Sequence, residues 1–234
     1  MERQFGRIKS NLDVRDYNLR NFIPRQILPQ VIKEKKWEYP AEPLDQGTTT
    51  HCVGFSMANW GINLPVHTPY NTKDAHTMYY QCKVLDGEPN KENGSTIRSA
   101  AKVLRSLNRI DSFAFAPDLG TIKYWLLNRG PLIVGTVWTE SMMLPSPITN
   151  MLSINGDIVG GHAYVINEWR IDEYIGIQNS WGPDWGKNGK AYIAAADFEK
   201  LFKYDGEAMA AVELEAMNQP HKCVIGDFFS NLFK

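Results

Sequence analysis

The spacing of hydrophobic residues along the chain changes near Pro131. Before this point, apolar positions recur every three or four residues, which is typical of one buried face of a helix. The pattern predicts helices over residues 52–60, 75–85, 97–107 and from 119 to near 130. Gly61 is placed to end the first helix, and Ser95 or Thr96 to cap the third. The third is the clearest, with one face made of Ile97, Ala100, Ala101, Leu104 and Leu107.

After Pro131 the apolar residues form short runs that are typical of strands. These runs cover residues 132–138, 162–169, 174–180, 190–194 and 207–214. Helices first and strands second indicate an α+β fold, in which a helical lobe packs on an antiparallel sheet. A cleft between two such lobes is a common place for a ligand.

The expected domain organisation follows from these patterns. Residues 1–45 are rich in Arg, Asn, Pro and Gln and predict an extended N-terminal arm. The main domain covers 46–234, with the helical lobe at about 46–115 and the sheet lobe at about 131–215. A C-terminal tail at about 216–234 is amphipathic, and we expect it to pack on the body of the domain.

Composition narrows the function classes. The chain has 25 basic and 26 acidic side chains, so charge gives no reason to expect a nucleic-acid or membrane partner. Three cysteines are too few for a disulfide framework and favour a reducing compartment. The N-terminus lacks the apolar stretch of a signal peptide, and no apolar run is long enough to span a bilayer. We therefore expect a cytoplasmic location.

One cysteine lies at the start of the first predicted helix, within Q-G-T-T-T-H-C-V-G-F-S, Gln46 to Ser56. Unpaired N–H groups and the macrodipole at a helix start favour an anion, so we expect a lowered pKa for the Cys52 thiol. The thiolate is the nucleophile that acyl transfer needs. The side-chain amide of Gln46 is placed to donate to a developing oxyanion.

A histidine and an asparagine lie in two further motifs. His162 begins a predicted strand in G-G-H-A-Y-V-I, behind two glycines that allow another backbone to approach closely. Imidazole is the usual base for a cysteine nucleophile. Asn179 ends the next strand, in Q-N-S-W-G-P-D-W-G-K-N-G, so a hairpin can bring it beside His162. Its side-chain carbonyl can then orient the ring, and Trp181 can shield that bond from water.

Together these motifs resemble the papain-like cysteine peptidases, whose Cys, His, Asn order they share. A fourth stretch, N-G-S-T-I-R-S-A-A-K-V-L (93–104), resembles the family's segment that pairs with extended substrate. The resemblance runs from about residue 44 to about 195. It implies a helical lobe followed by an antiparallel β-sheet or barrel lobe, with the active site in the cleft between them.

The resemblance also implies a role for each matching residue. Cys52 would be the nucleophile, His162 the general acid/base and Asn179 the orienting residue, while Gln46 and the Cys52 amide would form the oxyanion hole. The implied reaction is hydrolysis of a peptide bond in a polypeptide substrate, through a thioester and without a cofactor. The loop over 142–159 is expected to shape specificity. The expected substrate-binding residues are Gly94, Ser95, Gly161, Ala163 and Trp181.

Some features depart from the family's pattern. Thr50 and His51 replace the Gly-Ser before the nucleophile, so we expect Thr50 to crowd the cleft and His51 to perturb the thiol pKa. Only 51 residues precede Cys52, which leaves little room for a long helical inhibitory pro-segment, and we expect the chain to be made without one. The spacings of His and Cys fit no standard zinc pattern, so no metal is expected.

Two other interpretations remain open. In the first, the chain is a weakly active or inactive relative that binds peptides in its cleft, an alternative motivated by Thr50 and His51. In the second, it is another thiol acyl-transfer enzyme with the same residue order, such as a transglutaminase or a cell-wall amidohydrolase. The N-S-W-G motif after residue 178 argues against the second.

Overall fold

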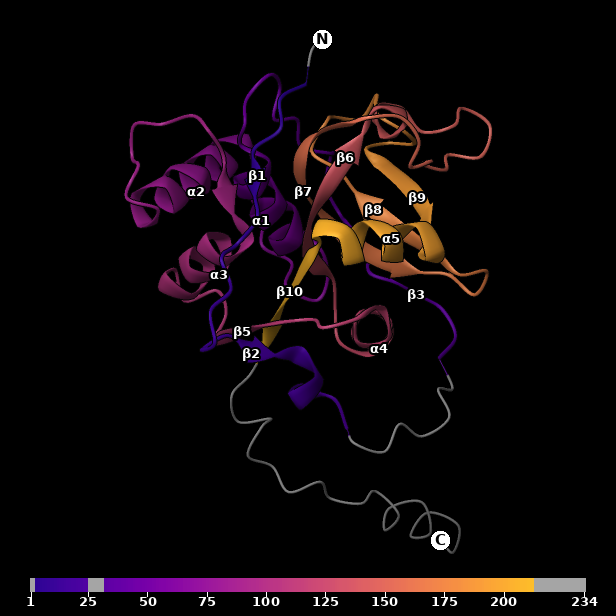
Figure 1. Ribbon diagram of the computed structural model, residues 1–234, viewed down its shortest axis with the longest axis horizontal. Helices are drawn as coiled ribbons and strands as arrows, with labels where there is room; N and C mark the ends of the chain where they lie inside the picture. Colours follow the sequence, from indigo (N-terminus) through magenta and orange to yellow (C-terminus); the bar gives the residue numbers. More distant parts are fainter. Residues whose placement is uncertain (1–2, 25–31, 213–234) are drawn as a thin grey trace, which may run out of the picture.

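The structure, a computed structural model of the chain, describes residues 3–24 and 32–212. The helices are α1 (Cys52–Ile62), α2 (Thr72–Leu85), α3 (Ile97–Ser106), α4 (Leu119–Asn128) and α5 (Ala195–Asp205), with short 3-10 turns η1 (Leu19–Phe22) and η2 (Glu140–Met143). Helices α1, α2 and α3 gather on one side and a large sheet with α4 and α5 on the other, with the N-terminal segment running between them (Figure 1).

An eight-stranded sheet forms the second lobe. Its order is β2-β5-β10-β6-β7-β8-β9, with β3 paired to β7. The pairs are antiparallel except for β2 on β5. The strands are β2 (Tyr17–Asn18), β3 (Lys35–Lys36), β5 (Ser112–Phe115), β6 (Leu132–Thr139), β7 (Ile158–Trp169), β8 (Tyr174–Gln178), β9 (Lys190–Ala194) and β10 (Glu207–Val212). Within the described residues the order ends at β2 and β9, so the sheet stays open and the barrel alternative is wrong.

The α+β fold class is confirmed, and several boundaries differ from the expected ones. Gly61 lies inside α1 rather than ending it, because the helix continues to Ile62 and the ring of Tyr70 fills the space beside the glycine. Leu107 follows α3 and is 36% exposed, so it does not belong to the buried face. The cap at Thr96 is confirmed, since its side chain accepts a hydrogen bond from the Ser99 N–H.

Helix α5 and strand β5 are among the elements that the sequence analysis did not predict. Helix α5 covers the sheet with a stripe of buried residues, Ala195, Phe198 and Leu201, that was overlooked although its spacing is helical. Strand β5 joins the chain's first lobe to the sheet by pairing with β10. The expected C-terminal tail at about 216–234 lies outside the described residues.

Part of the expected arm is built into the sheet lobe. Strand β2 pairs with β5, and β3 pairs with β7. Leu19 and Phe22 in η1 are buried in the main core beneath the sheet. Residues 17–22 and 35–36 are therefore packed parts of the fold, and the segment before them is the part that runs along the boundary between the lobes.

Helix α1 joins the two lobes. Its eleven residues are all buried, which fits a helix that is enclosed on every side. One core contains Cys52, Val53 and Met57 from α1 together with Ala163 and Val165 from β7. The N-terminal end of α1 is thereby held against the middle of β7, and this contact positions the candidate site.

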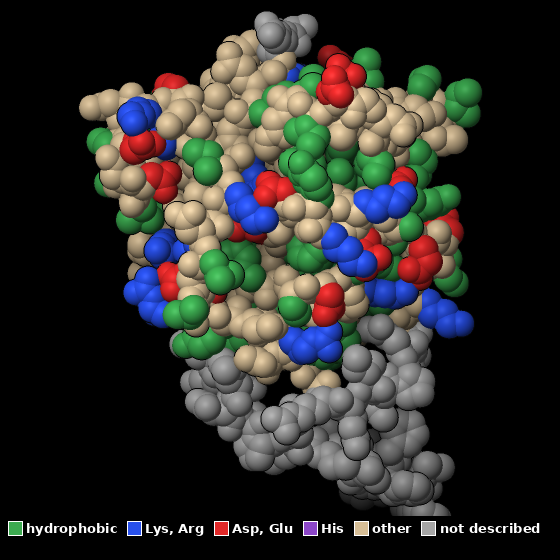
Figure 2. Space-filling view, in the orientation of Figure 1, with side chains coloured by type: hydrophobic (Ala, Val, Ile, Leu, Met, Phe, Trp, Pro, Cys, Tyr) green, Lys and Arg blue, Asp and Glu red, His purple; other side chains and the backbone are tan. Residues whose placement is uncertain are grey.

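The surface carries no one-sign charge patch on the face in Figure 2, where Lys and Arg alternate with Asp and Glu. Salt bridges such as Lys200–Asp197 and Lys203–Glu199 account for part of this mixture. Within residues 3–24 and 32–212, each helix is too short or too polar to cross a membrane.

A buried lysine holds the loop that follows α2. The Lys83 side chain is fully buried, and its Nζ donates to Glu88 Oε2 at 3.1 Å, to Asn93 Oδ1 at 2.7 Å and to the Gly94 carbonyl at 2.9 Å. A buried ammonium is tolerated only when its donors are satisfied in this way. Lys83 therefore anchors the backbone at Gly94, where β4 (Ser95–Thr96) begins.

Replacing Lys83 with Met should lower the free energy of unfolding by about 2–4 kcal/mol, because Glu88 and the Gly94 carbonyl lose a buried partner. Lys91 is the matched control, since its exposed Nζ pairs with the same Glu88. Lys91→Met should cost less than about 1 kcal/mol. Urea denaturation of both variants measures the difference, and equal losses would contradict the role of Lys83.

Candidate active site

Cys52 is the first residue of α1 and is fully buried. The residue before it, His51, is the N-cap and makes no side-chain capping bond. The backbone N–H groups of Ala163, Gly6 and Val53 act on the sulfur and favour its charged form. The thiol therefore lies between the start of its own helix, strand β7 and the N-terminal segment.

His162 and Asn179 are brought together by the hairpin of β7 and β8. His162 lies in the middle of β7, opposite Thr136 of β6, rather than at a strand start. Asn179 follows β8 directly, and its N–H donates to the Gly189 carbonyl. His162 Nε2 donates to Asn179 Oδ1 at 2.8 Å, and both side chains are fully buried. The other ring nitrogen, Nδ1, has no hydrogen-bond partner within the described part of the chain.

Aromatic rings enclose this pair. The Trp181 ring centroid lies 5.0 Å from that of His162, and Trp138 lies 4.8 Å from it at a steep angle. Phe5, from the N-terminal segment, contacts His162 edge-on at 5.9 Å and Trp181 at 6.1 Å. The bond between His162 and Asn179 is therefore shielded from water on several sides.

Gln46 reaches the same region from the loop before α1. Its N–H donates to the Ser180 carbonyl, next to Asn179. Its side-chain Nε2 donates to the Thr49 carbonyl at 2.8 Å and to the Gln4 carbonyl at 3.3 Å. The amide that was expected to stabilise an oxyanion is thus partly engaged by the N-terminal segment.

The segment Arg3–Ser10, here called the cleft segment, occupies the space between the lobes (Figure 1). Its strand β1 (Arg7–Ile8) pairs in parallel with β4. The Gly6 carbonyl accepts from the Ser95 N–H at 2.8 Å. A Cβ on Gly94 would lie 2.1 Å from the Gly6 oxygen, so this contact needs glycine.

The other side of the cleft segment rests on the glycine pair of β7. A Cβ on Gly161 would lie 2.3 Å from the Arg7 carbonyl oxygen, and one on Gly160 would meet the Phe5 side chain at 2.5 Å. Further back, Arg3 Nη2 donates to the Trp181 carbonyl at 2.9 Å. The expected substrate-binding residues therefore surround a piece of the chain's own backbone.

Burial under this segment sets the charge state of the site. Burial raises the pKa of the Cys52 thiol to about 11, although nearby N–H groups and Arg7 oppose the shift. Burial likewise lowers the pKa of His162 to about 4, against the effect of its bond to Asn179. The expectation of a lowered thiol pKa is therefore wrong for this closed state, because desolvation outweighs the helix terminus.

The two residues before Cys52, Thr50 and His51, are accommodated in different ways. The His51 ring stacks on Tyr79 at 3.7 Å, its Nδ1 lies 2.6 Å from His76 Nδ1, and its Nε2 contacts Glu92. It is absent from the groups that shift the Cys52 pKa. Thr50 does border the cleft, since its carbonyl oxygen would lie 1.8 Å from a Cβ on Gly6.

Comparison of the sequence with known protein families identifies the family of this chain. Residues 44–211 match the papain family of cysteine proteases. The chain belongs to the papain family. It is therefore a hydrolase of the cysteine-peptidase class. No curated protein sequence matches this papain-family chain.

Solved structures agree on the papain-like fold. Xylellain, a cysteine protease from Xylella fastidiosa, shares 17% identity, with 89% of this chain and 96% of that chain covered and a TM-score of 0.67. Procathepsin L 3 from the larval midgut of Tenebrio molitor shares 13% identity, with 82% of this chain and 73% of that chain covered and a TM-score of 0.56. The proform of the ragweed pollen cysteine protease Amb a 11 shares 14% identity, with 82% of this chain and 67% of that chain covered and a TM-score of 0.59.

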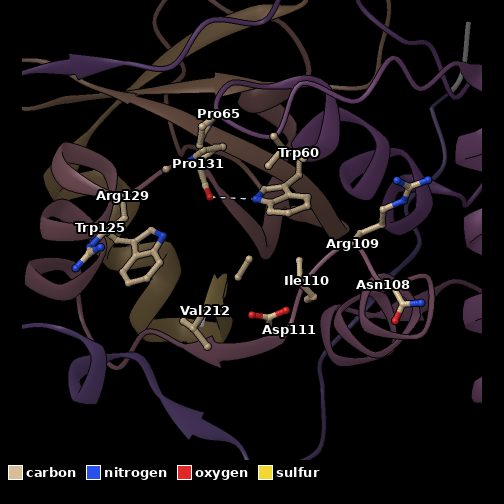
Figure 3. Close-up of a pocket in the computed structure, with 13 residues that line it drawn as sticks. Trp60, Pro65, Asn108, Arg109, Ile110, Asp111, Trp125, Arg129, Pro131 and Val212 are labelled. Carbon is tan, nitrogen blue, oxygen red and sulfur yellow. Dashed lines mark hydrogen bonds between the residues drawn. The ribbon is translucent and has the colours of Figure 1, made fainter. Parts of the chain in front are cut away.

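The papain-family chain has a second hollow of about 310 Å³, away from Cys52 (Figure 3). Trp60 lies at its upper wall and donates to the Pro131 carbonyl at 3.2 Å, while Trp125 borders it on the left and Asp111 from below in this view. Cys52 is at the opposite end of α1, about 12 Å along the helix axis. This hollow is therefore separate from the cleft.

Sequence reasoning about this protease missed the cleft segment. Residues 3–10 have no strong pattern, and their position depends on partners about 90 and 155 residues away in the chain, at Ser95 and Gly161. One signal was present, because Gly94, Gly160 and Gly161 had already indicated a close approach by another backbone. What the sequence could not show was that this backbone belongs to the same chain.

Gly6→Ala should displace the cleft segment of the protease, because the new Cβ would overlap the Thr50 backbone, which cannot move aside. Alkylation of Cys52 by iodoacetamide should then accelerate by at least about tenfold as the open population grows. Leu12→Ala, two residues after the cleft segment at a position that is 97% exposed, is the control. Unchanged alkylation in the Gly6 variant would show that the segment does not protect the thiol.

The folded protease should lose stability as pH falls from 6.5 toward about 4. Unfolded His162 takes up a proton in this window, whereas the buried ring does not, so the unfolded state binds more protons. The contribution is up to about 3 kcal/mol. Urea denaturation across this range should show a shallower decline for His162→Gln than for the wild type. Parallel declines would mean that the ring is not held neutral.

Proposed function

We propose that the chain hydrolyses peptide bonds with Cys52 as nucleophile, His162 as general acid/base and Asn179 as the residue that orients the ring. The observation that carries this proposal is the buried hydrogen bond from His162 to Asn179. His162 directly precedes Ala163, whose N–H acts on the Cys52 sulfur. The free Nδ1 of His162 is then the nitrogen available to exchange a proton with the thiol.

The reaction follows from these positions. An extended peptide pairs with the backbone of Gly94 and Ser95. This pairing brings the scissile carbonyl of the peptide to Cys52. His162 takes the thiol proton as the sulfur attacks, and the oxyanion is held by the Gln46 amide and the Cys52 N–H. The protonated ring then gives its proton to the leaving amine. Water, activated by the same ring, hydrolyses the thioester and frees the second product.

In this proposal, the cleft segment is a built-in inhibitor. It already pairs with Ser95, engages the Gln46 amide and covers His162 with Phe5. A peptide substrate needs the same positions, so the two exclude each other.

Displacement of the segment also restores the reactive charge state. Both pKa shifts arise mainly from burial, and hydration of the cleft reduces that penalty for the thiolate and the imidazolium. The helix start and the N–H of Ala163 then favour the thiolate, as the sequence indicates for an open site. In the closed chain Cys52 and His162 are thus both neutral, and they become a thiolate and an imidazolium when the cleft opens.

The Gly6→Ala chain, with its cleft segment displaced, should cleave fluorogenic peptides, and adding Cys52→Ala should abolish this activity. Adding His162→Ala should lower kcat by about 10²–10⁴. Adding Asn179→Ala should lower it less, because the base remains but loses its orientation. Asn167→Ala is the matched control, since this buried Asn on β7 bonds to Asn63 at 2.7 Å, far from the thiol, and should leave kcat unchanged.

Product analysis separates this proposal from the other interpretations. Peptide binding without turnover in the Gly6→Ala chain would favour a peptide-binding relative over an enzyme. Transfer of the acyl group to an added amine in preference to water would favour an acyl transferase. Turnover that survives Cys52→Ala would reject the assignment of the nucleophile.

A further inference from the structure

The side chain of Arg7 leaves the cleft and enters a pocket in the sheet lobe. Its neighbour Gly6 presents its N–H to the Cys52 sulfur and its carbonyl to Ser95. The Arg7 backbone rests on Gly161, and its side chain is only 1% exposed. The pocket therefore opens directly beside the position of the nucleophile.

Three strands define how deep the pocket is. Glu207 of β10 lies opposite Gly135 of β6, and Gly135 lies opposite Ala163 of β7. Two strand spacings, about 10 Å, therefore separate Glu207 from the residue that contacts the thiol. A Cβ on Gly135 would lie 2.7 Å from Arg7 Nε, so the absence of a side chain there leaves room for a long one from the cleft.

The far end of the pocket is anionic. Arg7 Nη2 donates to Glu207 Oε2, and Nη1 donates to Asp205 Oδ2, each at 2.6 Å. The Glu207 side chain is 9% exposed and also accepts from the Ser10 N–H at 3.1 Å. Lys9 pairs with the outer oxygen of Asp205 from the solvent side. Without Arg7, two carboxylates would face the pocket, one of them buried, with no cation between them.

We propose that this pocket selects an arginine side chain in the peptide substrate, with Glu207 and Asp205 as the residues that determine the specificity. The inference rests on the proposed function, because it assumes that substrate replaces the cleft segment. The segment then blocks the site by presenting the same side chain that the site prefers in a substrate.

The geometry distinguishes arginine from other residues. A guanidinium places its two terminal nitrogens on two different carboxylates at once, whereas an ammonium is a single point charge. Lysine should therefore bind more weakly than arginine. A neutral side chain should bind most weakly, because it leaves the carboxylate of Glu207 buried without a partner.

Peptide binding tests the pocket independently of turnover. The protein is the full chain carrying Arg7→Ala and Cys52→Ala, and the probes are peptides with the sequence of residues 3–11 that carry Arg, citrulline, Lys or Leu at position 7. Citrulline has the shape of arginine without its charge. The tethered segment competes equally with every probe, so the ratios of the dissociation constants keep their meaning.

Isothermal titration should give an affinity for the Arg peptide at least about tenfold above that for the citrulline peptide. Adding Glu207→Gln should reduce this ratio to about threefold or less, while Lys9→Ala, which removes only the outer cation, should preserve it. Circular dichroism confirms that each variant is folded. Equal affinities for the Arg and citrulline peptides would overturn the proposal, as would an unchanged ratio in the Glu207→Gln chain.

Turnover by the Arg7→Ala chain with Cys52 intact then separates the two proposals. Fluorogenic peptides with a single Arg scanned through each position should show one position where Arg exceeds citrulline in kcat/KM, and Glu207→Gln should remove that preference. Binding preference without any turnover would refute the proposed hydrolysis and retain the pocket as an arginine site. Turnover without preference at any position would retain the hydrolysis and refute the pocket's role in specificity.

Discussion

The packing of α1 against β7 is the contact on which the rest of the site depends. All residues of α1 are buried, and its first residue, Cys52, shares a core with Ala163 of β7. His162 precedes Ala163, so the same contact that buries apolar surface also brings the imidazole's strand to the thiol. Close packing of α1 on the other side needs Gly54, where a Cβ would lie 2.3 Å from the Ala75 carbonyl. The same packing contact therefore buries apolar area and places Cys52 beside β7.

The cleft is shaped for a backbone. Gly94 and Gly161 face each other across it, and the chain's own Gly6 and Arg7 fill the space between them. A side chain at either glycine would close the cleft to the segment and to a peptide substrate alike. In the proposed function, inhibition and substrate binding depend on the same positions, so a change at the glycines that frees the cleft also weakens substrate binding.

The ionisable groups near the thiol and those in the side pocket of Arg7 lie in different electrostatic environments. Near the thiol, burial holds Cys52 and His162 neutral, because neither charged form has enough compensation. In the side pocket, the guanidinium of Arg7 pairs with the carboxylates of Asp205 and Glu207. The segment is thus anchored by two ion pairs of Arg7, and in the proposed function it inhibits the site by keeping the thiol and the imidazole desolvated. Loss of the anchor and return of water to the thiol are expected to occur together.

The sequence by itself determined the α+β order, the helix that begins at residue 97 and the motifs around Cys52, His162 and Asn179. These signals are local, since helical spacing, strand runs and short motifs need only neighbouring residues. The tertiary structure alone decided that Arg3–Ser10 fills the cleft, that the Cys52 pKa is raised and that Glu207 lies beneath Arg7. Each of these depends on contacts between residues far apart in the chain, and their desolvation and ion pairing exist only once the fold has brought those residues together.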